Sequence, residues 1–375
     1  MQTRHHPILR QRNRIVVSIL FLIASIASPA SAATKPPSER ADIPVLTFAT
    51  LGDSRAEPGA TESEQDKRWL QNTPVFAQIV DGIRAQAPQL VFFNGDMIMG
   101  YSADAALIER EYAYWRGMIA GLLEHGSYVV PVPGNHETQR ADGKGQPKLA
   151  RAENEQLWRD NMGDLILDAA RFERAVGMAP QAFDPANHPT RDSDGNTSDQ
   201  SQLSYSFDAK GLHFVVLNTD AVGQDSRAPA HWLETDLDAA EKRGVARSFV
   251  FGHRPAYTYN LNGGEKKAGF DADADNQNAF WNAIERHHAI YFCGHQHILH
   301  MMQPRAREGG QAWQITVGSG GSPLAAKQPT GNPLDREYAW VLAKVYKSGE
   351  VRLEARGFDH VGQTSRRLDV RTVKR

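Results

Sequence analysis

The sequence contains a single cysteine, and its basic residues do not outnumber its acidic ones. The single thiol, Cys293, excludes an intramolecular disulfide framework and any metal site built on several thiolates, so metal ligands must come from histidines, carboxylates and amides. Lys and Arg number 42 against 44 for Asp and Glu, which gives a net charge of −2. A chain without a basic surplus lacks the electrostatic footprint of a dedicated DNA or RNA binder. We therefore expect no nucleic-acid partner.

Motifs of several enzyme classes are also absent from the sequence. No G-x-x-x-x-G-K-[ST] pattern occurs, which excludes the P-loop nucleotide enzymes. Residues 318–322 read G-S-G-G-S and lack the G-x-S-x-G elbow of serine hydrolases. His136-Glu137 is not followed by the second histidine of the H-E-x-x-H motif of zinc proteases.

No apolar run reaches the length of about 18 residues that a membrane-spanning helix needs. The first 32 residues combine four arginines and no acid, an apolar run at 15–27 and the small residues Ala30-Ser31-Ala32. This order is typical of a secretory signal peptide, with cleavage after Ala32. Cleavage would leave 38 basic against 44 acidic residues, so we expect an exported, periplasmic or secreted protein of charge −6 without membrane association. A retained N-terminal anchor is the alternative.

Hydrophobic periodicity predicts alternating strands and helices, and hence α/β layers. Apolar runs rich in Val, Phe and Ile predict strands at 45–51, 90–94, 127–132, 212–218, 248–251 and 290–293. Apolar residues three and four apart predict helices at 74–86, 104–123, 230–243 and 276–287. We expect one catalytic domain over residues 40–330, interrupted at 138–203 by a polar insertion near the mouth of the site that includes loop chemistry at 191–197. A β-hairpin of strands 338–346 and 350–356, within 331–375, would complete the same domain.

Metal-capable side chains follow five of these predicted strands. The blocks are Gly52-Asp53, Gly95-Asp96, Gly134-Asn135-His136-Glu137, Gly252-His253 and Gly294-His295-Gln296-His297. Ligands of α/β proteins bind outside the carboxyl ends of strands, so these ends are expected to meet in one pocket. Two aspartates, one asparagine and three histidines suit Fe, Mn or Zn, and a bridging carboxylate lets such a set hold two ions. Each block alone is typical of an ordinary turn, cap or core histidine, whereas their joint occurrence in this order indicates a metal site.

These blocks resemble, in the same order, those of the calcineurin-like metallophosphoesterase superfamily and its purple acid phosphatase-like members. The resemblance covers roughly residues 44–325. It implies a four-layer αββα sandwich with two mixed β-sheets and a centre of two divalent or trivalent ions, Fe, Mn or Zn. By resemblance, Asp96 bridges both ions. Asn135, His253 and His295 would complete the second site, and Asp53 and His297 would serve the first.

The first block departs from the family pattern. The family places a histidine two residues after the first aspartate, whereas this chain has Arg55, whose protonated guanidinium cannot bind a metal. Purple acid phosphatases instead use a tyrosine three residues after the second aspartate, where this chain has Met99, and Tyr101 lies two residues further on. The first site is therefore expected to bind its ion weakly, to take extra water or to remain empty. Arg55 itself is either a bidentate clamp for a phosphate oxygen or an exposed loop residue, and the sequence leaves both open.

The function that these residues predict is an exported metal-dependent phosphoesterase acting on a small phosphorylated substrate, with monoesters preferred. A metal-activated hydroxide would attack phosphorus, and His136, held by Glu137 and Asp53, would donate a proton to the leaving alkoxide or orient the ester. One alternative is a phosphodiesterase or nucleotidase of the same superfamily. Another is a non-catalytic protein that binds a metal or a phosphorylated ligand with an impaired first site. The sequence gives no indication of oligomeric state.

Overall fold

The computed structural model describes residues 43–57, 64–261, 268–326, 330 and 332–374. The expected signal peptide, residues 1–32, lies outside these residues. The chain divides into two units, Met1–Ala41 and Asp42–Arg375, and the fold below is that of the second. Within the described ranges, none of the helices combines the length and apolar character that crossing a bilayer requires.

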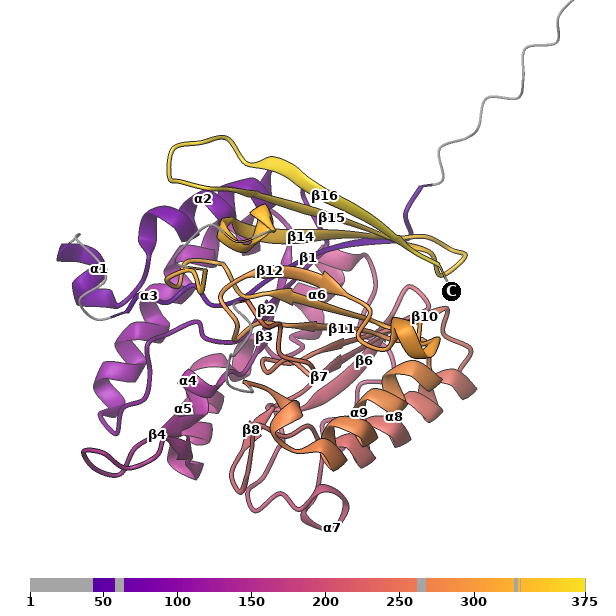
Figure 1. Cartoon of the computed structure of the whole chain (residues 1–375), viewed down its shortest axis with the longest axis horizontal. Helices are drawn as coiled ribbons and strands as arrows, with labels where there is room; N and C mark the ends of the chain where they lie inside the picture. The colour runs from indigo at the N-terminus through magenta and orange to yellow at the C-terminus, as the bar shows by residue number, and fades with distance from the viewer. Residues whose placement is uncertain (1–42, 58–63, 262–267, 327–329, 331, 375) are drawn as a thin grey trace, which may run out of the picture. The chain divides into compact units, whose positions relative to one another are not determined.

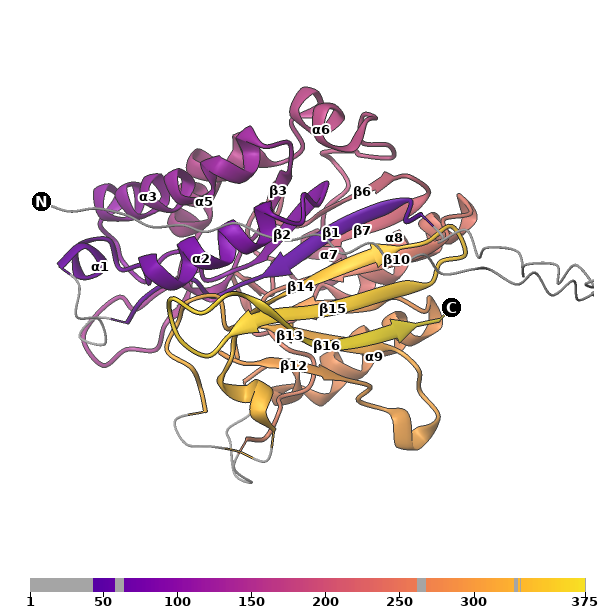
Figure 2. The same cartoon turned by 90° about the horizontal axis from the view of Figure 1, so that it is seen from above.

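A first six-stranded sheet has the strand order β16-β15-β14-β1-β2-β3, seen face-on in Figure 2. Its strands are β1 (Leu46–Leu51), β2 (Leu90–Asn94), β3 (Tyr128–Val132), β14 (Tyr338–Val345), β15 (Val351–Phe358) and β16 (Arg366–Val373). The first three run parallel, and β14 joins them by pairing antiparallel with β1. The segments expected as a C-terminal hairpin are β14 and β15, which pair from Tyr338 with Phe358 to Val345 with Val351. The edge strand β16 extends this hairpin to three strands.

A second six-stranded sheet has the order β12-β13-β11-β10-β7-β6. Its strands are β6 (Tyr205–Ala209), β7 (Leu212–Val216), β10 (Arg247–Phe251), β11 (Ile290–Cys293), β12 (Leu299–Met302) and β13 (Trp313–Val317). The four central strands run parallel, and the outer β6 and β12 are antiparallel to their neighbours. Both sheets are therefore mixed.

Amphipathic helices cover the outer faces of both sheets. They are α2 (Thr73–Arg84) and α3 (Ala105–Glu124) on the first sheet, and α8 (Ala230–Lys242) and α9 (Ala274–Arg286) on the second, on opposite sides in Figure 1. Each helix turns a stripe of buried apolar residues inward, such as Phe76 and Ile79 of α2. Asp104 caps α3 by accepting from the backbone N–H groups of Ala106 and Leu107. The expected four-layer α/β sandwich with two mixed sheets is confirmed.

The core between the sheets is built on phenylalanine. The Phe48 ring of β1 makes edge contacts with the rings of Phe92, Phe214, Phe249, Phe251 and Phe292. Phe92 of the first sheet also stacks on Phe251 of the second, with ring centroids 3.7 Å apart. Successive strand residues face opposite sides, so Phe93 instead packs under α2 and α3 against Phe76 and Trp115. This aromatic layer fixes one sheet on the other, close to the strand ends that carry the site.

The stretch 138–203 contains regular structure as well as loops. It holds β4 (Gln139–Arg140), β5 (Leu149–Ala150), α5 (Ala152–Met162), η1 (Gly163–Leu165), α6 (Ala169–Val176) and α7 (Arg191–Asp194). The segment 191–197 is therefore a loop only in part, because its first four residues form α7, which ends at Gly195 with φ of 71°. Phe172 of α6 packs between Tyr128 and Phe207, one from each sheet. The remaining elements are α1 (Glu64–Trp69), α4 (Asn135–Thr138), β8 (Asp220–Ala221), β9 (Gln224–Asp225), η2 (Phe270–Ala272), η3 (Ala306–Glu308) and η4 (Pro333–Arg336).

Candidate metal centre

The candidate ligands stand where strands of both sheets end. Oxygen donors come from the first sheet: Asp53 follows β1, Asp96 follows β2 and Asn135 follows β3. Imidazoles come from the second sheet, with His253 after β10, and His295 and His297 after β11. The two sheets thus contribute different chemistry to one site.

The backbone at these strand ends is tightly constrained. Asp53, Asp96 and His295 have left-handed φ values of 61°, 54° and 66°, a region that non-glycine residues avoid except where surrounding structure imposes it. A Cβ atom on Gly95 would lie 2.7 Å from both the Cα of Gly134 and the Nδ1 of His253. Only glycine fits there, because the two sheets approach each other closely at this point.

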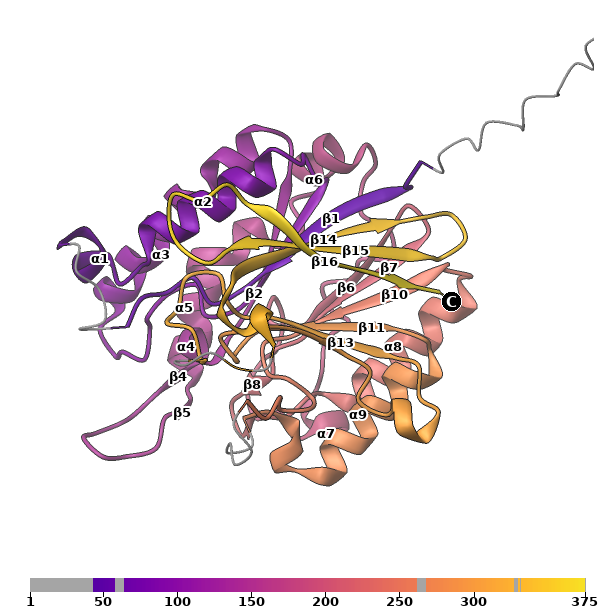
Figure 3. The ribbon, with the colours of Figure 1, turned by 45° about the horizontal axis from the view of Figure 1, so that its top comes forward.

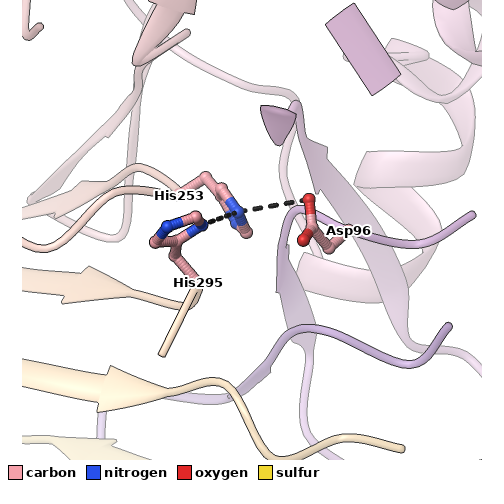
Figure 4. Close-up of side chains that lie close together, drawn as sticks. All are labelled: Asp96, His253 and His295. Atoms are coloured by element: carbon pink, nitrogen blue, oxygen red, sulfur yellow. Dashed lines mark hydrogen bonds and ion pairs between the residues drawn. The ribbon is translucent and has the colours of Figure 1, made fainter. Parts of the chain in front are cut away.

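One group of ligand atoms belongs to Asp96, His253 and His295, and these atoms lie within 4.8 Å of one another. Figure 4 shows His253 between the other two: its Nε2 is 3.2 Å from Asp96 Oδ1 and 3.2 Å from His295 Nδ1. Asn135 joins the group, since its Oδ1 lies 2.9 Å from both His253 Nε2 and His295 Nδ1. These are the four residues that the resemblance assigns to the second metal site.

A second group consists of Asp53, Asp96 and His297, again with ligand atoms within 4.8 Å of one another. His297 Nε2 lies 3.5 Å from Asp53 Oδ1. That oxygen is buried and has no hydrogen-bond partner in the part of the chain that the structure describes. An orphaned carboxylate oxygen facing an imidazole nitrogen fits a metal ion better than it fits a closed core. Asp96 belongs to both groups, which is the position of a bridging ligand.

Burial shifts the pKa values of three candidate ligands, His295, His297 and Asp53. It lowers the pKa of His295 well below its usual range, with the Arg254 charge adding to the effect. Burial and then Arg55 lower the pKa of His297 to about 4. Both rings are therefore neutral near pH 7. The Nδ1 of His297 donates to the Pro323 carbonyl, so its Nε2 keeps a lone pair for an ion. Burial also raises the pKa of Asp53 well above its usual value, and the Asp96 carboxylate raises it further.

Arg55 lies inside the site. Its side chain is 6% exposed, so the expectation of an exposed loop residue is wrong. Its Nε is 3.5 Å from Asp96 Oδ2, and its Nη1 pairs with Glu57. Ser322 anchors the backbone by donating its hydroxyl to the Arg55 carbonyl at 3.0 Å. A fixed positive charge thus stands against the carboxylate that both ligand groups share.

His136 and Glu137 have separate tasks. The Nδ1 of His136 donates to the Met99 carbonyl at 2.5 Å, and its Nε2 is 3.7 Å from Asp96 Oδ2. Glu137 accepts hydrogen bonds from the backbone N–H groups of Gly134, Asp96, Met97 and Ile98 at 2.7 to 3.2 Å. Glu137 therefore holds the loop that carries Asp96. The expectation that Glu137 and Asp53 orient His136 is wrong, because the Met99 carbonyl does so.

Three residues that contact the site were not predicted as part of it. Arg254 donates from Nη1 to His295 Nε2 at 2.7 Å and pairs through Nε with Asp220. Its only sequence signal is its place next to His253. The hydroxyl of Tyr101 contacts the Asn135 amide nitrogen, so this side chain supports a ligand instead of being one. The third residue, Lys148, lies over the Tyr101 ring and belongs to the insertion, where no motif marks it.

The model of one protein family, described as Calcineurin-like phosphoesterase, matches residues 69–299 of the chain. The chain belongs to this family. The resemblance inferred from the strand-end blocks is thereby confirmed, and family members depend on a dinuclear metal centre for which this chain has two ligand groups. The matched range contains every candidate ligand except Asp53, which precedes it together with Arg55.

Individual relatives resemble the chain in sequence or in fold, at low sequence identity. Purple acid phosphatase 21 of Arabidopsis thaliana is 28% identical over 127 residues, which is 32% of this chain and 28% of that protein. The purple acid phosphatase PPD1 of yellow lupin (Lupinus luteus) seeds superposes with a TM-score of 0.57 at 15% identity, over 88% of this chain and 53% of that one. PhoD superposes with a TM-score of 0.53 at 12% identity, over 89% of this chain and 72% of that one. The chain thus spans about half of the lupin protein and about a quarter of the Arabidopsis one.

Proposed function

We propose that this protein is a metal-dependent phosphoesterase that hydrolyses small phosphate esters, with a preference for monoesters. The observation that carries the proposal is the position of Asp96, whose carboxylate belongs to both ligand groups. Two ions bridged in this way would neutralise charge on phosphoryl oxygens and lower the pKa of a water molecule enough to make a nucleophile available near neutral pH. Asp96, Asn135, His253 and His295 would hold one ion, and Asp53, Asp96 and His297 the other.

His136 stands beside the place where ester and ions would meet. Since a carbonyl only accepts, the Nδ1 of His136 carries a proton toward Met99, and its Nε2 can donate only in the imidazolium form. Burial holds the pKa of His136 well below its usual value, although the Asp96 carboxylate opposes this shift. A phosphoryl dianion next to Nε2 would favour the imidazolium further, so substrate binding itself would prepare His136 to protonate the leaving oxygen.

The position of Arg55 supports two expectations, weak binding of an ion at the first metal site and a preference for monoesters. It stands where the family has a ligand, and its charge, 3.5 Å from Asp96, opposes a cation on that side of the carboxylate. The same charge attracts a phosphoryl oxygen. A monoester carries nearly two negative charges near neutral pH and a diester only one, so a fixed cation favours the monoester.

The decisive experiment supplies purified protein with Zn, Mn or Fe and measures hydrolysis of p-nitrophenyl phosphate and of bis(p-nitrophenyl) phosphate, with elemental analysis of bound metal. Faster turnover of the monoester is the expected result. Faster turnover of the diester would support a phosphodiesterase, and hydrolysis of nucleoside monophosphates alone would support a nucleotidase. Stabilisation by metal without turnover of any ester would support the non-catalytic binding protein.

Export is a separate proposal that rests on the first 32 residues. The arginine-rich start, the apolar run and the Ala30-Ser31-Ala32 site support cleavage by a signal peptidase. Expression of the full chain followed by cell fractionation and N-terminal sequencing is expected to find mature protein that begins at Ala33, outside the cytoplasm. Cytoplasmic protein that begins at Met1 would contradict the proposal.

A further inference from the structure

Lys148 is placed beside the metal centre by a short hairpin of the insertion. The hairpin pairs β4 with β5, and Lys148 is the residue just before β5. A backbone bridge joins Arg140 of this hairpin to Tyr101, and Asp225 accepts from both the Gln139 side chain and the Ala150 N–H at 2.7 Å. Figure 3 shows the hairpin projecting beside α4, the helix that carries Asn135 and His136. The base of the hairpin is therefore anchored, and the position of Lys148 is defined.

A chain of contacts connects Lys148 with the shared carboxylate. Its Nζ lies 3.4 Å from the centroid of the Tyr101 ring, and that ring lies 3.8 Å from the ring of His136. His136 Nε2 is in turn 3.7 Å from Asp96 Oδ2. Arg55 Nε is 3.5 Å from the same oxygen. Arg55 and His136 thus lie at Oδ2 of Asp96, whereas His253 lies at Oδ1. Lys148 is connected with the Oδ2 side through the rings of Tyr101 and His136.

The pKa of Lys148 is affected by charged groups of the site. Burial lowers the pKa of its ammonium, the Arg55 guanidinium lowers it further, and the carboxylates of Glu57 and Asp96 raise it. Unlike Arg55, Lys148 is exposed and pairs with a ring face instead of a carboxylate. A cation on a ring face keeps donors available for a stronger acceptor, and the four-carbon stem lets the ammonium move toward one.

We propose that Lys148 binds a phosphoryl oxygen of the substrate together with Arg55, and that this pair of cations makes the enzyme selective for phosphate monoesters. The inference rests on the proposed phosphoesterase function and assigns a specificity residue to it. Two positive charges outside the metal ions favour the second negative charge that a monoester carries and a diester lacks. The Tyr101 ring is the resting place of the ammonium when no substrate is bound.

The test compares Lys148→Met with Lys144→Met, which removes an exposed lysine four residues earlier in the same hairpin. Both proteins are loaded with Mn, and kcat/KM is measured for p-nitrophenyl phosphate and its bis-ester, alongside the Kd for inorganic phosphate by calorimetry. Lys148→Met is expected to lower monoester kcat/KM and phosphate affinity by about tenfold, the usual cost of one charged hydrogen bond, and to leave the diester within about twofold. Lys144→Met is expected to match the wild type, and Lys148→Arg to restore most of the loss.

The outcomes separate the inference from the function on which it rests. Wild-type protein that hydrolyses neither ester would overturn the phosphoesterase, and the phosphate Kd would still test Lys148. Unchanged phosphate affinity and monoester turnover in Lys148→Met would overturn the inference alone. Equal losses on both esters, or a fall in melting temperature and metal content that accounts for the loss, would also overturn it, because Lys148 would then act on structure instead of on the second charge.

Discussion

The Asn135 side chain is oriented by Tyr101. Its amide nitrogen donates to the tyrosine hydroxyl, so its oxygen must point the other way, to a place 2.9 Å from the ligand nitrogens of His253 and His295. This hydrogen bond holds the Asn135 side chain in place beside the two imidazoles, where its oxygen could serve as a ligand.

Replacing Tyr101 by phenylalanine should therefore weaken metal binding without removing a ligand. We expect the affinity for Mn or Zn in Tyr101→Phe to fall about tenfold, as is common when the outer partner of a ligand is lost. Competition with a chromogenic chelator measures it. Tyr114→Phe, on α3 and bonded to Thr73, is the matched control. Equal affinities of the two variants would show that Tyr101 does not act through Asn135.

Asp96→Asn should affect both ligand groups at once, because the carboxylate belongs to each. We expect bound metal to fall below one ion per chain and kcat/KM to fall by more than the roughly 10–100-fold that loss of an outer partner costs. Elemental analysis and p-nitrophenyl phosphate hydrolysis measure the two effects. Asp160→Asn, an exposed carboxylate on α5, controls for the loss of charge. Full activity in Asp96→Asn would show that the centre lies elsewhere.

Arg55→His introduces the side chain that the family resemblance implies for this position. The imidazole adds a ligand beside Asp53 and His297 and removes a positive charge 3.5 Å from Asp96. We expect more bound metal per chain and a smaller preference for monoesters over diesters. Arg55→Lys keeps the charge but adds no ligand, so its metal content should stay at the wild-type level. A rise in metal content in both variants would mean that space, and not the ligand, limits the first site.

A buried charge cluster remote from the centre should make stability depend on pH. His213 is bonded to Asp208 at 2.6 Å and Asp236 at 2.9 Å, and Arg243 pairs with Asp208 and lies 3.3 Å from the His213 ring. Burial lowers the pKa of His213, but the hydrogen bonds that its ring donates to the two carboxylates outweigh this effect and raise the pKa above the ordinary value. The folded-state pKa thus exceeds the unfolded one of about 6.5.

The sign of the effect follows from this order of pKa values. The stabilising contribution of His213 is fully present below the unfolded pKa and is lost as pH rises through the folded pKa. We expect the melting temperature to decline from pH 6 to pH 8.5, and to decline less steeply in His213→Asn, which has no proton to lose. Parallel melting curves of both proteins across this range would contradict the assignment.

The sequence predicts the strands and helices that position the ligands to within about two residues. The reason is that β2, β3, β10 and β11 are buried throughout, and β1 is buried except at the half-buried Thr47, so each is a clear apolar run. The ligands directly follow these runs and are found with them. The edge strand β16 was missed because charged residues alternate with its few apolar ones. The helix α5 was missed because Trp158 and Met162 supply most of its buried apolar surface.

Contacts between distant segments of the chain could not be predicted. Lys148 and Tyr101 are separated by 46 residues and meet only because β4 is bridged to Tyr101. Arg254 meets His295 across two strands of the second sheet. Neither contact is indicated by hydrophobic periodicity or by a sequence motif. The burial of Arg55 against Asp96 likewise depends on the pairing of β1 with β2.

The ligands are divided between the two sheets, so the metal centre forms only when the sheets pack against each other. The first sheet alone offers only carboxylate and amide oxygens, a set suited to Mg or Ca, and the second offers only imidazoles. The mixed set that suits Zn, Mn or Fe exists only when the phenylalanine layer between the sheets is packed. A bound transition metal is thus a reporter of the assembled tertiary structure, and its affinity includes the free energy of holding the two sheets together.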